Sequence, residues 1–257
     1  MNYIDVFNGD ADGICALHQL RLAEPRSEAR LVSGVKRDIA LLQQLTEVKD
    51  SSITVLDISL DRNRDSLETI LAQGNRVLYA DHHYAGEIPA SGQLTTHIDP
   101  DPVTCTSLIV NQLLGGKYLP WAIVGAFGDN LDEPANQLAQ QAGMEQAAIA
   151  QLRETGILLN YNGYGASIED LFFHPAELFR QVQPYIDPLQ FYAESPALRT
   201  LQEGYKEDMD QALSFAPIHQ DDAGRIYQLA NAPWSRRVSG VYANTLAREK
   251  PDLAHAM

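Results

Sequence analysis

Short apolar runs end on acidic residues at three places in the first third of the chain, and this pattern restricts the fold more than any other feature. Residues 3–7 precede an N-G-D-A-D-G turn, residues 53–56 precede Asp57, and residues 76–80 precede a D-H-H triplet. Segments with helical patterning separate the runs, as in parallel strands joined by helices. Open parallel sheets bind ligands at the carboxyl edge of their strands. The sequence therefore predicts an α/β fold with four carboxylates and two imidazoles at one edge.

The first hundred residues are predicted to repeat one strand and helix unit, which gives a parallel sheet flanked by helices. We expect strands at 3–7, 30–33, 53–56, 76–80 and 94–98. The expected helices lie near 12–22, 38–47, 61–73, 106–114 and 120–127. Gly74 suits the left-handed end of the third strand-covering helix.

Changes in composition divide the chain into three predicted parts. Residues 1–132 form the α/β core, and residues 133–215, which lack strand signals, form a helical connector. Residues 216–257 carry a strand candidate at 225–229 and a helix near 235–249. One strand and one helix cannot bury their own apolar faces. We therefore expect the last part to be the start of a second α/β domain, truncated as a return strand begins at Ala254.

Composition limits the partners of the protein. Acidic residues number 34 against 19 lysines and arginines, and the net charge of -15 repels long polyanions such as duplex DNA. Cys15 and Cys105 are expected to be small buried apolar residues without chemistry. The start of the chain does not resemble a secretory signal, and the longest strongly apolar run, 118–127, is too short to cross a membrane. We therefore expect a cytoplasmic protein that binds no membrane.

The carboxylates at the strand ends need cations. Asp10, Asp12, Asp57 and Asp129 with the imidazole of His82 offer mixed oxygen and nitrogen ligands. That set suits Mn²⁺, accepts Mg²⁺ and is too rich in carboxylates for a structural zinc site. Two ions roughly 3.5 to 4 Å apart, bridged by Asp57, would activate a water and hold the scissile phosphoryl group.

The residues beside these ligands are predicted to support them. His83 is expected to contact the substrate phosphate, and Asp81 to accept the free ring N–H of His82. Lys36 and Arg37 follow the second strand and would offer positive charge to the same phosphate. Each motif alone is weak, and their joint placement at successive strand ends favours a metal site.

These motifs resemble those of the DHH phosphoesterases. The family includes RecJ-type exonucleases, nanoRNases, phosphoadenosine phosphatases, cyclic dinucleotide phosphodiesterases and manganese pyrophosphatases. The resemblance covers residues 3 to about 132, through D-A-D-G, Asp57, D-H-H and a G-x-x-x-D that ends at Asp129. It implies that two metal ions are bound by Asp10, Asp12, Asp57, His82 and Asp129, and that His83 faces the substrate. The implied activity is hydrolysis of phosphodiester or phosphomonoester bonds in short single-stranded oligonucleotides or small nucleotides.

The chain departs from the family pattern at two places. Many members begin the first motif with H-x-D-x-D-G, whereas this chain has Asn8, whose amide oxygen is a weaker metal ligand than imidazole. The tail resembles the opening of a C-terminal substrate-binding module, in which Arg236 and Arg237 are expected to bind phosphate. The glycine-rich segment that finishes this module is not in the sequence, so the resemblance implies an incomplete substrate-binding half.

Three other functions remain open from the sequence. A haloacid-dehalogenase-type phosphatase also places D-x-D after its first strand, with Asp10 as nucleophile, but it explains neither Asp57 nor the histidine pair. A RecJ-like single-strand exonuclease is a narrower form of the same chemistry. A nucleotide sensor of the same fold, with weakened turnover, would account for Asn8 and the incomplete module.

Overall fold

Five parallel strands form one sheet in the computed structural model, which describes residues 2–257. The strand order is β2-β1-β3-β4-β5, with β1 (Asn2–Phe7), β2 (Arg30–Val32), β3 (Ser51–Leu56), β4 (Arg76–Asp81) and β5 (Leu94–Ile98). Phe7 pairs with Leu56, and Leu56 pairs with Ala80. The predicted parallel sheet is confirmed, and this register places the carboxyl ends of β1, β3 and β4 level with one another.

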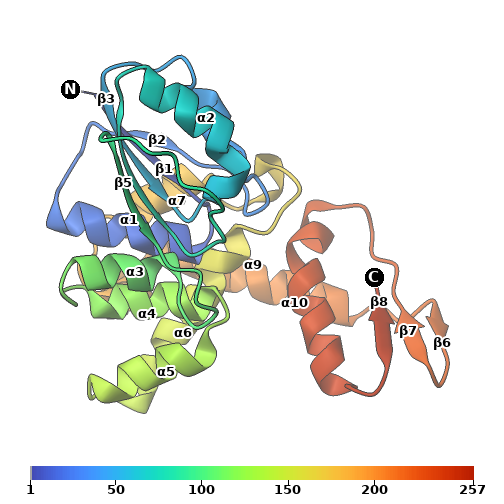
Figure 1. Ribbon diagram of the computed structural model, residues 1–257. Coiled ribbons are helices and arrows are strands. Elements are labelled where there is room, and N and C mark those ends of the chain that lie inside the picture. The colour runs from blue at the N-terminus through green and yellow to red at the C-terminus, as the bar shows by residue number, and fades with distance from the viewer. Residues whose placement is uncertain (1) are drawn as a thin grey trace.

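Helices cover both faces of the sheet because successive side chains of a strand point to opposite sides. Val6 packs with the apolar side chains of α2 (Leu60–Ala72) and the short 3-10 helix η1 (Leu41–Leu45). Phe7 packs on the other side, where α1 (Ala11–Ala23), α3 (Thr106–Leu113) and α4 (Leu119–Gly128) lie. Figure 1 shows these two helical layers.

The helix expected at 38–47 is wrong, since only the single 3-10 turn of η1 forms there. The side chain of Asn63 on α2 forms hydrogen bonds with the backbone of this segment. Its amide donates to the Ile39 carbonyl at 2.6 Å, and its oxygen accepts the Leu42 N–H at 3.3 Å. These backbone groups are thus satisfied without a continuous helical ladder.

The predicted helical region is confirmed. Its helices are α5 (Asp132–Gln141), α6 (Gln146–Asn162), α7 (Pro175–Val182), α8 (Pro188–Glu194) and α9 (Pro196–Leu213), with the short turn η2 (Ile168–Asp170) after α6. The prolines begin α7, α8 and α9, because the first helical position needs no N–H donor. None of the helices among residues 2–257 combines the length and apolar character needed to cross a lipid bilayer.

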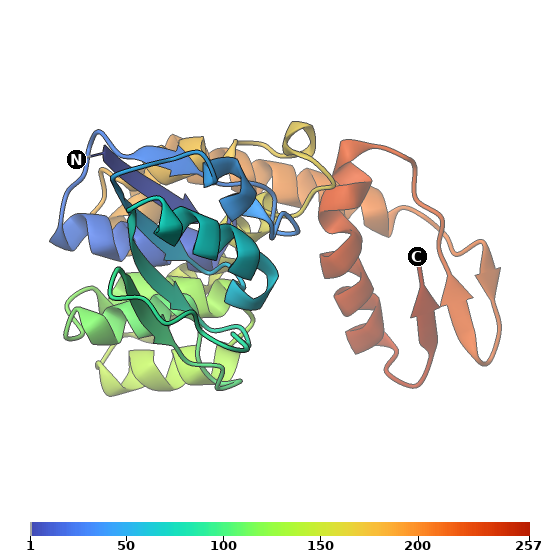
Figure 2. The same ribbon diagram turned by 45° about the horizontal axis from the view of Figure 1, so that its top comes forward.

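The C-terminal part contains α10 (Pro233–Glu249) and a three-stranded sheet of order β6-β7-β8. Strand β7 (Gly224–Ile226) is shorter than expected, β6 (His219–Gln220) was not expected, and β8 (Ala254–Ala256) is the return strand, parallel to β7. In both views α10 faces the larger part of the molecule and the strands lie outside it (Figures 1 and 2). The division into three parts stays a prediction.

Candidate metal centre

The predicted acidic residues lie together at the carboxyl edge of the sheet. The strand order reverses between β1 and β3, and ligands of such sheets bind at this point. Asp10 caps α1 and accepts the Gly13 N–H at 3.1 Å, while Asp12 lies in the first turn of the same helix. Asp57 follows β3 directly, and its backbone N–H donates to Ala80 of β4. The loop after β1 and the ends of β3 and β4 therefore converge.

Asp12 is held by the start of α3. Its two carboxylate oxygens accept the backbone N–H groups of Thr106, at 2.8 Å, and Ser107, at 2.7 Å. A Cβ on Gly125 of α4 would lie 2.1 Å from the Ser107 hydroxyl and 3.3 Å from the Asp12 carboxylate. The glycine of the G-x-x-x-D motif is thus required for close packing, and it lets α4 carry Asp129 to the cluster.

Asp57 has an unusual backbone conformation and is surrounded by other carboxylates. Its φ of 58° lies in the left-handed region, which non-glycine residues seldom adopt outside sites that need a special geometry. The Thr106 hydroxyl donates to its carboxylate at 3.3 Å. Burial, together with the negative charges of Asp10 and Asp12, raises the pKa of Asp57 well above its ordinary value.

His82 and Asp129 complete the cluster. His82 Nε2 lies 3.3 Å from Asp57 Oδ1 and 3.6 Å from Asp129 Oδ2. Ligand atoms of Asp12, His82 and Asp129 lie within 4.8 Å of one another, as do those of Asp57, His82 and His83. Burial and the neighbouring Asp12 and Asp10 raise the pKa of Asp129 to about 6, although Lys36 and His82 partly offset them.

Asp81 contacts the other histidine of the triplet, which corrects the sequence prediction. Its carboxylate lies 2.7 Å from His83 Nδ1, and it makes no hydrogen bond to the His82 ring among residues 2–257. Residues two apart in an extended segment point to the same side, whereas neighbours point to opposite sides. This hydrogen bond, although burial opposes it, raises the pKa of His83.

Lys36 lies inside the acidic cluster. Its Nζ is 2.5 Å from Asp10 Oδ2 and 3.5 Å from Asp129 Oδ1, and it donates to Asn160 Oδ1 at 3.1 Å. Burial lowers the pKa of this ammonium, but the charges of Asp10 and Asp129 outweigh burial and raise it. Lys36 is therefore ion-paired with the predicted ligands, not turned toward a substrate. Arg37 is exposed and has no ion pair among residues 2–257.

The residues present fit a divalent cation. Carboxylate oxygens and one imidazole nitrogen are suitable ligands for Mn²⁺ and Mg²⁺. Burial and neighbouring carboxylates raise the pKa of both Asp57 and Asp129, so a bound cation would favour their ionised forms. Asn8 Oδ1, on the loop after β1, is buried and has no hydrogen-bond partner in the described chain.

Arg236 and Arg237 are held in ion pairs, contrary to the expected phosphate-binding surface. Arg236 donates to both carboxylate oxygens of Asp170, at 2.8 and 2.6 Å. Arg237 lies 2.7 Å from Asp208 and donates to the Asp170 carbonyl at 2.5 Å. These arginines fasten α10 to η2 and α9, because each meets an acid on those elements.

A cavity that the sequence reasoning missed lies between α10 and the α/β core. Its volume is about 220 Å³, and Asn130, beside Asp129, and Asn160, which contacts Lys36, both line it. Arg248 of α10 adds positive charge to its wall, whereas Arg153 of α6 is paired with Asp132, which also lines it. A sequence signal existed, since Gly240, Asn244 and Arg248 recur every fourth residue, which places them on one face of a helix.

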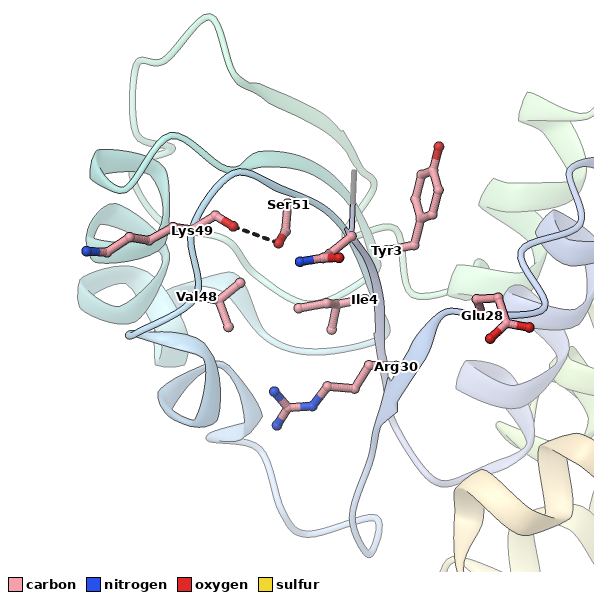
Figure 3. A pocket seen from close by; sticks show the side chains of 8 residues that line it. Tyr3, Ile4, Glu28, Arg30, Val48, Lys49 and Ser51 are labelled. Carbon is pink, nitrogen blue, oxygen red and sulfur yellow. Dashed lines mark hydrogen bonds between the residues drawn. The ribbon is translucent and has the colours of Figure 1, made fainter.

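Another hollow, of about 420 Å³, lies at the opposite edge of the sheet. It is lined by Tyr3, Ile4, Arg30, Lys49, Ser51 and their neighbours, at the amino ends of β1, β2 and β3 (Figure 3). Its one acidic side chain, Glu28, cannot assemble a metal site alone. The carboxyl edge is therefore the candidate functional site.

Comparison with known proteins supports the fold. The sequence matches no family model and no curated protein. A crystal structure of the exonuclease RecJ bound to manganese superposes with a TM-score of 0.63 and 15% identity over 99% of this chain and 75% of that one. The chain has a RecJ-like fold.

Two further structures share this RecJ-like fold. RecJ from Thermus thermophilus, in complex with Mn²⁺, gives a TM-score of 0.55 at 16% identity over 99% of this chain, which spans 43% of that RecJ. CDC45 from Entamoeba histolytica gives 0.55 at 9% identity over 98% of this chain and 80% of its own. Identities this low establish the fold alone, so function must be argued from the site.

Proposed function

We propose that the protein is a divalent-metal-dependent phosphoesterase. Its substrates would be short single-stranded oligonucleotides or small nucleotides, in which it would hydrolyse phosphodiester or phosphomonoester bonds. The observation that carries the proposal is the convergence of Asp12, Asp57, His82 and Asp129 at the carboxyl edge of a RecJ-like sheet. Mn²⁺ is the ion named with both RecJ structures, and the same oxygen-rich ligands accept Mg²⁺.

The side chains divide the chemical work. Asp12, Asp57, His82 and Asp129 would bind the ion, with the Asp12 carboxylate oriented by the backbone N–H groups of Thr106 and Ser107. A bound divalent ion polarises a phosphoryl oxygen and lowers the pKa of a coordinated water.

His83 would contact the substrate. Asp81 holds its Nδ1 and raises its pKa, so the ring is oriented and Nε2 donates a hydrogen bond to a phosphate oxygen. The His83 side chain is 44% exposed, which gives a substrate access to it.

Substrate size follows from the charge distribution. Arg37, next to Lys36 in the chain, and Arg248, in the wall of the cavity beside α10, are exposed arginines without an ion pair among residues 2–257. The rest of the surface belongs to a chain of net charge -15, which penalises each phosphate outside the site. Short substrates should therefore react faster than long ones, and long duplex DNA should be a poor substrate.

Hydrolysis assays with and without manganese test the proposal. Dinucleotides, phosphoadenosine phosphate, cyclic dinucleotides, labelled single strands and a long duplex are incubated with the wild type, Asp57→Asn and, as a matched control, Asp65→Asn on the exposed side of α2. We expect product from the wild type and the control with Mn²⁺, and none with EDTA or with Asp57→Asn.

Each contrary outcome identifies a different error. Product formation by Asp57→Asn, or in EDTA, would remove the metal-dependent mechanism. Nucleotide binding without product from any substrate would favour the sensor, whereas stepwise release of mononucleotides from long single strands would favour a RecJ-like exonuclease.

A further inference from the structure

We propose that Lys36 occupies the position of one of the two expected ions, so that the centre binds a single divalent ion at Asp12, Asp57, His82 and Asp129. The ammonium is then the built-in cation of the other half of the centre, at Asp10. This inference rests on the proposed metal-dependent function and specifies how many ions it uses.

Asp10 has partners within the chain for both of its carboxylate oxygens. Its Oδ2 lies 2.5 Å from Lys36 Nζ, and its Oδ1 accepts the Gly13 N–H at 3.1 Å. Ligand atoms gather within 4.8 Å in two groups, and Asp10 belongs to neither. Both oxygens of Asp10 are thus engaged by the protein itself, and a second ion there would meet an ammonium at contact distance.

Helix α6 and the loop after it hold Lys36 in this position. The Lys36 ammonium donates to Asn160 Oδ1 at 3.1 Å, and Asn160 Nδ2 donates to the Tyr164 hydroxyl at 2.9 Å. The Lys36 backbone N–H donates to the Gly163 carbonyl at 2.9 Å. Anchors at both ends of the residue make the ammonium part of the site, so an ion at Asp10 would have to displace it against these contacts.

Asn8 weakens the same half of the centre. It lies on the turn that carries Asp10, and it supplies an uncharged amide oxygen, where an imidazole would be a stronger ligand. The other half keeps three carboxylates and His82. The two halves therefore differ in ligand strength and in fixed positive charge, and both differences favour one ion over two.

Counting bound manganese tests the inference without an activity assay. The wild type, Lys36→Met and, as a matched control, Lys49→Met are equilibrated with Mn²⁺, and the ions per chain are measured by elemental analysis. Lys49 lines the hollow at the opposite edge of the sheet. We expect one ion per chain in the wild type and the control, with the paramagnetic resonance spectrum of an isolated Mn²⁺, and two coupled ions in Lys36→Met.

The outcomes separate this inference from the proposed function. Two coupled ions in the wild type, or one ion in a folded Lys36→Met, would overturn it, and the wild-type spectrum decides even if the variant does not fold. Two ions with manganese-dependent hydrolysis would overturn the inference alone. One isolated ion without hydrolysis of any substrate would support the inference and overturn the proposed function, and no bound ion would overturn both.

Discussion

The metal centre and the α10 interface both hold buried acids, but they neutralise them differently. At the interface, Asp170 meets Arg236 and Asp208 meets Arg237. In the metal centre, the ammonium of Lys36 pairs with Asp10 and Asp129, and the ring of His82 lies near Asp57 and Asp129.

Two acids, Asp170 at the interface and Asp57 in the centre, have pKa shifts in opposite directions. Hydrogen bonds from Arg236 hold the pKa of Asp170 below its ordinary value, so the folded interface favours the ionised carboxyl. Burial and neighbouring carboxylates raise the pKa of Asp57, so the folded centre disfavours it. A cation supplied from outside the chain would favour the ionised form of Asp57, as Arg236 does for Asp170.

The largest expected effect is the loss of activity on Asp57→Asn. We predict a fall of at least about 10³-fold in kcat/KM, equivalent to about 4 kcal/mol, because the central ligand is lost. The free energy of unfolding in EDTA should stay equal or rise, because a buried carboxylate that repels its neighbours becomes neutral. Denaturant unfolding checks this, and a large loss of stability in EDTA would mean that Asp57 is a structural residue.

The next largest effect is on stability, at the interface. Asp208→Ala should lower the free energy of unfolding by about 3 kcal/mol, because it leaves the buried Arg237 without its partner. The exposed fractions are 11% for the Arg237 side chain and 9% for Asp208, against 78% and 61% for Lys206 and Asp210. Asp210→Ala on the same helix is therefore the control, with a change under about 1 kcal/mol.

The manganese affinity of the Asp208→Ala variant should remain that of the wild type. A common loss of stability and affinity would show that the two regions are coupled and would end the comparison.

The effect of pH on the metal centre should be smaller than these two mutational effects. Manganese affinity should fall about tenfold for each pH unit below pH 6. Asp129, with a pKa of about 6, is protonated there, and a proton must leave before the ion binds. The metal-free protein should behave in the opposite way. Since the folded pKa is raised above the ordinary 3.8, stability rises as pH falls from about 6 to 4. Affinity that does not change between pH 5 and 7 would show that Asp129 is not a ligand.

The smallest expected effect is at the cavity. Arg248→Gln should raise KM by about three- to tenfold with little change in kcat, because an exposed arginine contributes uniform binding to a phosphate. Arg180→Gln, on the exposed part of α7, is the control and should leave KM unchanged. Equal KM values for the two variants would show that substrate does not reach the α10 cavity.

The positions of the proposed metal ligands could be predicted because their signals are local. Each apolar run marks a strand, and the parallel register then brings the end of β1, which leads into the turn with Asp10, beside Asp57. The pairing of Asp81 with His83 was also readable, because alternation in an extended segment favours residues two apart. The prediction that Asp81 contacts the adjacent His82 neglects this alternation and is wrong.

The misplaced cations depend on partners far away in the sequence. Lys36 contacts Asn160, 124 residues later, and Arg236 contacts Asp170, 66 residues earlier. No spacing rule predicts such long-range pairs. In the sequence, a basic residue near a strand end or helix start therefore looks available to a ligand. The helix expected at 38–47 failed for the same reason, because the competing hydrogen bonds come from Asn63 on another element.

Thermal unfolding with EDTA and with saturating Mn²⁺ tests most directly the claim that the acidic cluster needs a cation from outside the chain. The wild type should gain about 2.7 kcal/mol of stability at a manganese concentration 100 times the Kd, and its unfolding temperature should rise by several degrees. Asp57→Asn should show little or no rise. An unfolding temperature of the wild type that is equal in EDTA and in Mn²⁺, or an equal rise in Asp57→Asn, would contradict the account.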